Sequence, residues 1–194
     1  WRSVARCHIM KSLVIDTSSS RTTVGLFDGT ALIYAEHHDG ATAHAEALPK
    51  LVSQALQRSS SIDEVIVGMG PGPFTGLRAG IVFAQTFAHL RGIPWRGVCS
   101  LDGIDIDSED YVVATDARRN EIYWARYQSG SRIDGPSVSK REILETLHIP
   151  IFGYSFTEEL FPSSQLLLAR SRTSEVDQPM YLRRPDAVPT SERQ

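Results

Sequence analysis

The sequence has few cysteines and no long apolar run. Cys7 and Cys99 are its two cysteines and no CxxC pair occurs, so a disulfide framework is excluded and a reducing, cytoplasmic setting is favoured. No apolar stretch approaches the roughly 18 residues that a membrane-spanning helix needs. We therefore expect no contact with a membrane.

An excess of basic residues is also missing. The chain has 20 Lys and Arg against 23 Asp and Glu, a net charge of −3. Proteins that bind nucleic acid unaided usually carry a basic face, so we expect contact with RNA only through a partner. The hydrophobic content of 41% is ordinary for a globular protein and is enough for a packed core.

Patterns for metal binding and nucleophilic catalysis are missing as well. The six histidines include the neighbours His37 and His38, but no HxxxH or HExxH spacing occurs. There is no GxSxG segment, and Cys99 has no histidine near it in sequence. The serine run 18–20 is typical of a turn. We therefore expect neither a metal site nor a catalytic residue.

The apolar patterning indicates an α/β protein with a mixed sheet. Short apolar runs alternate with two longer segments of helical spacing, and Asp28-Gly29 is typical of a hairpin turn. The expected order is strands at 13–15, 22–27 and 31–37, a helix at 44–58, a strand at 65–67, a helix at 75–90 and a strand at 93–98.

Composition suggests where the domains begin and end. Met10 stands directly before the first strand, so we interpret residues 1–9 as an extension. The link 100–110 is acidic and too short for a helix with its turns. We therefore predict a first domain at 10–103, a second, reduced domain at 104–184 and a flexible tail at 185–194.

The second half of the chain repeats the start of the first. An apolar strand ends at Asp16, and another ends at Asp116; each is followed by a short polar turn and a second strand. This pattern predicts two related half-domains, although two unrelated hairpins would give it too.

The rest of the second half has few elements. Ser139 and Glu142 have the spacing of a capping box, which predicts a helix at 139–147. A strand fragment is expected at 151–152 and a short element at 165–169.

The most distinctive segment is 70–80, Gly-Pro-Gly-Pro-Phe-Thr-Gly-Leu-Arg-Ala-Gly, between an expected strand and an expected helix. Phosphate-binding loops occupy such places. However, no Lys-Ser/Thr pair follows, and the last glycine falls one position late for the dinucleotide fingerprint. Pro71 and Pro73 also have no N–H to donate to a phosphate. We therefore favour a rigid turn and a helix that begins with Thr75 as its N-cap.

The helix at 75–90 has apolar residues on two sides, whereas an ordinary surface helix has one apolar stripe. Either it is buried between its own sheet and a neighbouring helix, or one side meets another protein. Its small residues would allow close approach of a partner. On the second interpretation, Ala84→Arg would prevent association and leave the monomer folded.

Strand ends supply the candidates for a ligand cleft. Asp16 with Thr17, and Asp116, follow apolar strands, and open sheets bind ligands at the carboxyl ends of their strands. Arg118 and Arg119 can meet an anion in the same cleft. Turn capping by the aspartates and a solvated pair of arginines are the alternatives.

Taken together, these segments resemble the bacterial TsaB (YeaZ) family. Residues 70–80 are similar to its GPGSFTGLRIG stretch, with Pro73 in place of the usual Ser. Four further segments agree: Leu-Val-Ile-Asp-Thr-Ser at 13–18, His-Ala-Glu-Ala-Leu-Pro at 44–49, Asp-Ala-Arg-Arg-Asn-Glu-Ile-Tyr at 116–123 and Pro-Met-Tyr-Leu-Arg at 179–183. The likeness spans 11–184, but the link 100–110 and the second domain are short for the family.

The resemblance implies a fold of the actin/Hsp70/sugar-kinase class, built from duplicated half-domains. It implies a non-catalytic subunit in the synthesis of threonylcarbamoyladenosine in tRNA, with two partners: TsaD, the catalytic paralogue, and TsaE, an ATPase. The tRNA would be contacted only indirectly. No cofactor is expected, and adenine nucleotide would bind weakly and only in the complex. Two alternatives stay open: an active ATPase or kinase of the same fold, and a glycoprotease-like peptidase.

The resemblance also places the partner on the helices at 44–58 and 75–90. Because a two-fold axis lets an apolar patch meet itself, we expect the same surface to form a homodimer when TsaD is missing. The family motif loop contributes Gly70, Gly72, Phe74, Thr75, Gly76, Arg78 and Gly80. The residues expected to contact the partner are His44, Leu48, Leu51, Leu77, Ile81, Ala84, Phe87 and Ala88.

Overall fold

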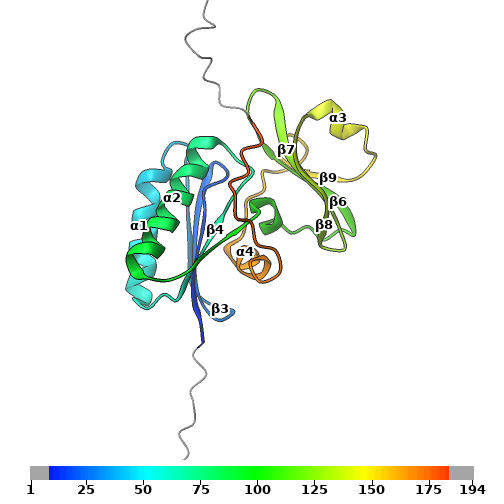
Figure 1. Cartoon of the computed structure of the whole chain (residues 1–194). Helices are drawn as coiled ribbons and strands as arrows, with labels where there is room; N and C mark the ends of the chain where they lie inside the picture. The colour runs from blue at the N-terminus through cyan, green and yellow to red at the C-terminus, as the bar shows by residue number, and fades with distance from the viewer. Residues whose placement is uncertain (1–8, 184–194) are drawn as a thin grey trace, which may run out of the picture.

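The computed structural model describes residues 9–183, so most of the expected extension and the expected tail lie outside it. Two mixed sheets lie side by side (Figure 1). The first has the order β3-β2-β1-β4-β5, in which β1, β4 and β5 are parallel and β2 is antiparallel to both of its neighbours, β1 and β3. Its strands are β1 (Lys11–Asp16), β2 (Arg21–Asp28), β3 (Ala31–Asp39), β4 (Glu64–Gly68) and β5 (Trp95–Val98).

Two long helices cover one face of this sheet (Figure 1). They are α1 (His44–Arg58), as the spacing predicted, and α2 (Phe74–Arg91). Their apolar stripes pack with β1 and β4 in the main core. Helix α2 begins one residue earlier than predicted, with Pro73 rather than Thr75 at the N-cap position, and it ends at Gly92 in the left-handed conformation with a φ of 64°.

A third helix, α4 (Ser164–Arg170), covers the opposite face of the first sheet. Leu167 and Leu168 pack there with Val14 and Ile66. Further along, the backbone N–H of Val176 donates to the carbonyl of Gly97 on β5. The predicted second domain at 104–184 is therefore too long, because its C-terminal part returns to the first sheet.

The second sheet has the order β8-β7-β6-β9, which repeats the order β3-β2-β1-β4. Its strands are β6 (Asp110–Asp116), β7 (Glu121–Gln128), β8 (Ser131–Lys140) and β9 (Ile151–Gly153). As in the first sheet, the first strand has an antiparallel neighbour on one side and a parallel neighbour on the other. Here β7 and then β8 follow on the antiparallel side of β6, and β9 lies parallel to β6 on the other side. The predicted duplication into two actin-like halves is confirmed by this shared topology.

The capping box predicted at Ser139 is wrong. Ser139 belongs to β8, where its Oγ accepts a hydrogen bond from Trp124 Nε1 at 3.0 Å. The helix that follows, α3, covers only Arg141–Glu145, and Lys140 holds its N-cap position. Pairing with β7 therefore keeps this part of the chain extended.

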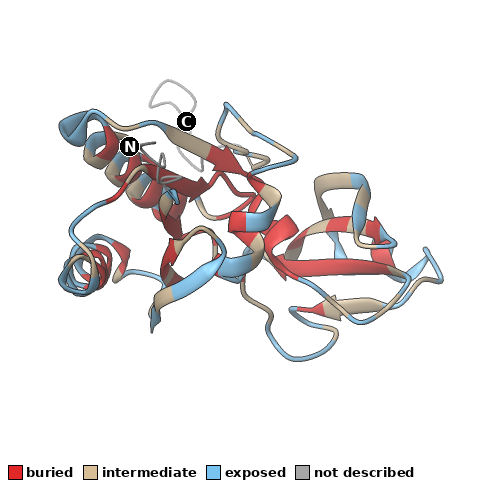
Figure 2. Cartoon of the chain, turned by 90° about the horizontal axis from the view of Figure 1, so that it is seen from below, coloured by how far each residue is buried: buried red, intermediate tan, exposed pale blue. Residues whose placement is uncertain are grey.

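The link between the halves forms a short 3-10 helix, η1 (Ser100–Gly103). Its Asp102 accepts hydrogen bonds from Tyr127 Oη at 2.9 Å and Arg132 Nε at 2.8 Å, both on the second sheet. The link therefore fixes one half against the other. Buried residues fill the inner strands of both sheets, whereas exposed ones lie on the outer faces of the helices and along the edge strand β3 (Figure 2). Within 9–183, no helix has the length and apolar character to cross a bilayer.

Candidate functional site

The motif loop packs tightly against the end of β1. A Cβ on Gly76 would lie 2.7 Å from the carbonyl oxygen of Thr17, and one on Gly80 would lie 2.3 Å from Thr17 Oγ1. That hydroxyl donates to the carbonyl of Gly76 at 2.7 Å. These two glycines therefore let α2 approach β1. Close packing, and not contact with a phosphate, explains their place in the motif.

Asp16 is enclosed beneath the motif loop. One carboxylate oxygen accepts hydrogen bonds from Ser18 N at 2.9 Å and Ser18 Oγ at 2.8 Å, and the other accepts one from Ser100 Oγ at 2.6 Å. Ser100 Oγ in turn accepts from Gly70 N. Burial raises the pKa of Asp16 above its usual value, although these hydrogen bonds lower it. Asp16 thus ties β1 to the loop that begins at Gly70.

A polar cleft of about 290 Å³ lies between the two halves. It is lined by Ser18, Ser19, Ser20, Pro73, Thr115, Asp116, Arg118, Tyr154, Glu159 and Leu160. Asp116 and Arg118 were predicted here from the sequence, whereas Glu159 and Tyr154, which come from the loop after β9, were not. That loop carries no motif that would reveal them.

The other predicted cleft residues lie elsewhere. Asp16 and Thr17 are buried and do not line the cleft, because their side chains turn toward Ser100 and α2. Arg119 is exposed outside the lining. The expectation of a cleft with an aspartate from each half is therefore wrong for the first half.

The cleft has little positive charge to offer an anion. Arg118 Nη1 lies 3.2 Å from Asp116 Oδ2, and the backbone N–H of Arg118 donates to Asp116 Oδ1 at 2.7 Å. Glu159 adds a second carboxylate and accepts a hydrogen bond from Ser20 Oγ at 3.2 Å. Within 9–183, no three metal-ligating side chains are close enough to hold an ion together.

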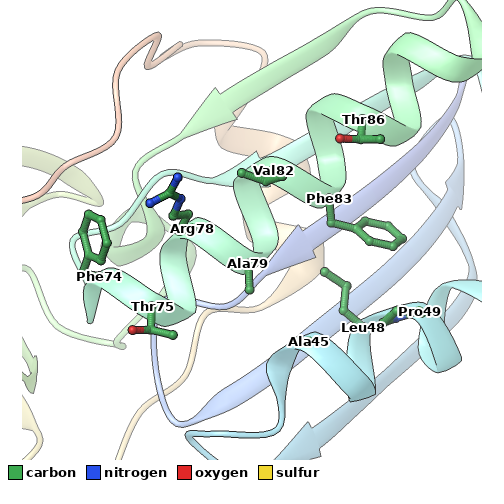
Figure 3. A pocket seen from close by; sticks show the side chains of 10 residues that line it. All are labelled: Ala45, Leu48, Pro49, Phe74, Thr75, Arg78, Ala79, Val82, Phe83 and Thr86. Carbon is green, nitrogen blue, oxygen red and sulfur yellow. The ribbon is translucent and has the colours of Figure 1, made fainter.

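A larger, apolar groove of about 670 Å³ runs between α1 and α2. Figure 3 shows Phe83 of α2 and Leu48 of α1 pointing toward one another across it. Phe74 and Val82 expose 45% and 50% of their surface at this groove. The full lining is Ala45, Leu48, Pro49, Phe74, Thr75, Arg78, Ala79, Val82, Phe83 and Thr86.

Most of the residues predicted to contact the partner face the interior of the monomer and not the solvent. Seven of the eight are buried in the monomer: His44, Leu48, Leu51, Leu77, Ile81, Ala84 and Ala88. Six of these belong to the main core, and Phe87 is partly buried against it. Only Leu48 also reaches the groove, at its floor. The structure therefore corrects the prediction: the exposed side of α2 carries Phe74, Arg78 and Val82.

His44 is buried and is not part of the exposed surface. Its Nδ1 lies 2.8 Å from Thr22 Oγ1 on β2, and burial lowers the pKa of its ring below the usual value. A Cβ on Gly76 would lie 3.2 Å from His44 Nε2. His44 therefore packs the start of α1 against β2 and α2.

Comparisons with known proteins agree with this architecture. The family model of TsaD, described as tRNA N6-adenosine threonylcarbamoyltransferase, matches residues 38–150, more than half of the chain. Two solved structures from Pseudomonas aeruginosa share the fold. YeaZ is 24% identical with a TM-score of 0.68 over 89% of this chain and 100% of its own. An uncharacterized protein similar to peptidase YEAZ is 23% identical with a TM-score of 0.73 over 90% and 100%.

Sequence relatives are closer. An uncharacterized protein of Mycobacterium tuberculosis is 38% identical over 96% of this chain and 98% of its own length. The tRNA threonylcarbamoyladenosine biosynthesis protein TsaB of Escherichia coli is 33% identical over 61% of this chain. That match spans 55% of the Escherichia coli protein. An uncharacterized Mycobacterium leprae protein is 40% identical over 91% of this chain, and the match spans 56% of that protein. The chain therefore belongs to the family described by the tRNA N6-adenosine threonylcarbamoyltransferase model.

Proposed function

We propose that the chain is a non-catalytic subunit of the complex that adds a threonylcarbamoyl group to the adenosine beside the anticodon of tRNA. It acts in the cytoplasm by binding the catalytic paralogue TsaD, with the ATPase TsaE as a further partner. The observation that carries the proposal is the apolar groove between α1 and α2, with Phe74 and Val82 half exposed at it. Exposed apolar patches of this kind are typical of protein interfaces.

The polar cleft supports a non-catalytic role. Arg118 is paired with Asp116, and Asp16 is enclosed by Ser18 and Ser100. An ATPase or kinase needs a carboxylate that reaches the substrate and donors that reach the phosphates. Asp116 and Glu159 do line the cleft, but Arg118, the arginine of its lining, is paired with Asp116, so the cleft offers a phosphate little positive charge, which argues against the ATPase alternative.

The isolated chain should hydrolyse ATP no faster than a buffer control and should transfer no threonylcarbamoyl group to tRNA. It should also fail to bind tRNA at submicromolar concentration in physiological salt, because the net charge is −3. Phosphate release measures ATP hydrolysis, and filter binding measures the binding of tRNA. ATP turnover that Asp16→Asn abolishes would favour the kinase alternative.

Binding to TsaD tests the proposal itself. Val82→Arg places a charge among the apolar residues that line the groove, at a side chain that is 50% exposed, and we expect the dissociation constant measured by calorimetry to rise at least tenfold. Ile143→Arg is the matched control, because Ile143 is 55% exposed on α3, far from the groove. Equal affinity of wild type and Val82→Arg for TsaD would refute the proposed docking.

A further inference from the structure

A second groove lies on the other flank of α2. It measures about 350 Å³ and runs between α2 and the segment 179–181, with Gln85, Pro179 and Tyr181 in its lining. Phe74, Arg78 and Val82 line this groove and the α1–α2 groove alike. The three side chains therefore form a ridge, here called the α2 ridge, with an apolar groove on each side.

The wall at 179–181 is fixed to both halves of the molecule. Met180 N donates to the carbonyl of Met69 at 2.8 Å, directly before the motif loop. The ring of Tyr181 lies 4.9 Å from that of Phe74, centroid to centroid. Two residues later, Arg183 Nη1 donates to the carbonyl of Ala117 at 2.9 Å. In Figure 1 this segment, drawn in red, runs between the two halves. The second groove is thus preformed.

Arg78 gives the α2 ridge a positive charge. Its guanidinium lies 5.9 Å from the centre of the Phe74 ring. No carboxylate of the described residues forms a salt bridge with it. A complementary surface would therefore place an acidic side chain opposite Arg78, between two apolar contacts.

The helix pair alone offers a small area. Helix α2 has 18 residues, so it is about 27 Å long at 1.5 Å per residue. Helix α1 has 15 residues and is about 22 Å long. With a strip about 10 Å wide for each helix, the pair presents roughly 500 Å², whereas a specific interface buries about 800 Å² on each partner. The second groove is continuous with the first through the α2 ridge, so it supplies area where the helix pair falls short.

We propose that the partner sits astride the α2 ridge and fills both grooves, so that Tyr181 and Pro179 are contact residues for TsaD. This inference rests on the proposed function, because it extends the same docking surface. The partner surface has two apolar contacts that flank a carboxylate. The C-terminal segment is then part of the interface as well as a connection between the two halves.

Calorimetry with the full chain and the TsaD protein of the same genome tests the proposal. Tyr181→Ala should raise the dissociation constant about tenfold, as should Gln85→Arg, which alters the second groove from the α2 side. Tyr181→Phe keeps the ring and should stay within about twofold of wild type. Ile143→Ala is the exposed control, and thermal melts establish that each variant is folded.

The possible results separate the two proposals. If Tyr181→Ala and Gln85→Arg weaken the binding of TsaD and Ile143→Ala leaves it unchanged, the extended surface is supported. If Val82→Arg weakens binding while folded Tyr181→Ala and Gln85→Arg bind like wild type, the surface ends at the α2 ridge and only the extension is lost. If Val82→Arg is silent as well, both proposals are overturned. Should Tyr181→Ala unfold, Gln85→Arg alone decides.

Discussion

Ala84→Arg is expected to unfold the chain instead of merely separating it from a partner. Ala84 is fully buried in the core that α2 forms with the first sheet. An arginine there must displace packed side chains and bury a charge without a counter-ion, each of which is costly. The combined loss should exceed about 4 kcal/mol, which approaches the lower end of the 5–15 kcal/mol that stabilises a typical domain. Circular dichroism during urea titration measures it.

Val82→Arg, two positions earlier on the same helix, is the matched comparison. Half of the Val82 surface is exposed, so the new side chain can extend into solvent. Its free energy of unfolding should stay within about 0.5 kcal/mol of wild type. An Ala84→Arg protein with a wild-type urea midpoint would contradict the core assignment and restore the expectation made from the sequence, that Ala84 faces a partner.

Sequence periodicity was sufficient for the elements of the first half and their order. Helix α1 has the predicted bounds, and α2 extends the predicted range 75–90 by one residue at each end. Both have strong apolar repeats and clear ends, and Gly92 can adopt the left-handed conformation that ends α2. The echo between Asp16 and Asp116 likewise predicted two related half-domains, because these residues end β1 and β6, which hold matching places in the two sheets.

The sides of α2 could not be assigned in the same way. Its small and apolar residues occur on two sides, and small residues suit close packing on a sheet as well as on a partner helix. The structure puts Ala84 and Ala88 on the sheet and leaves Val82 outside. The direction of the Asp16 side chain could not be predicted either, because its hydrogen-bond partner Ser100 lies 84 residues away in sequence. The return of α4 to the first sheet is equally long-range.

Gly80→Ala should destabilise the protein although alanine is the better helix former. The exchange gains about 1 kcal/mol of helix propensity. Against this, the new Cβ would lie 2.3 Å from Thr17 Oγ1. Thr17 cannot turn away freely, because it is buried, β-branched and hydrogen-bonded to the carbonyl of Gly76. Overpacking of this kind costs up to about 3 kcal/mol and loss of the hydrogen bond adds about 1, so a net loss of about 2–3 kcal/mol is expected.

A double-mutant cycle isolates the cause. Thr17→Ala alone removes the hydroxyl and should cost about 1–2 kcal/mol, since the Gly76 carbonyl loses its donor. In the Thr17→Ala/Gly80→Ala protein the clashing oxygen is gone and the closest remaining atom, the Cβ of residue 17, lies 3.3 Å from the new Cβ. The second substitution should therefore cost far less than it does beside Thr17, because the gain of about 1 kcal/mol in helix propensity offsets this milder contact. Urea unfolding of the four proteins gives the coupling energy. Additive losses would show that Gly80 is required for a reason other than its contact with Thr17, and the interpretation of the motif as a packing device for α2 would fail.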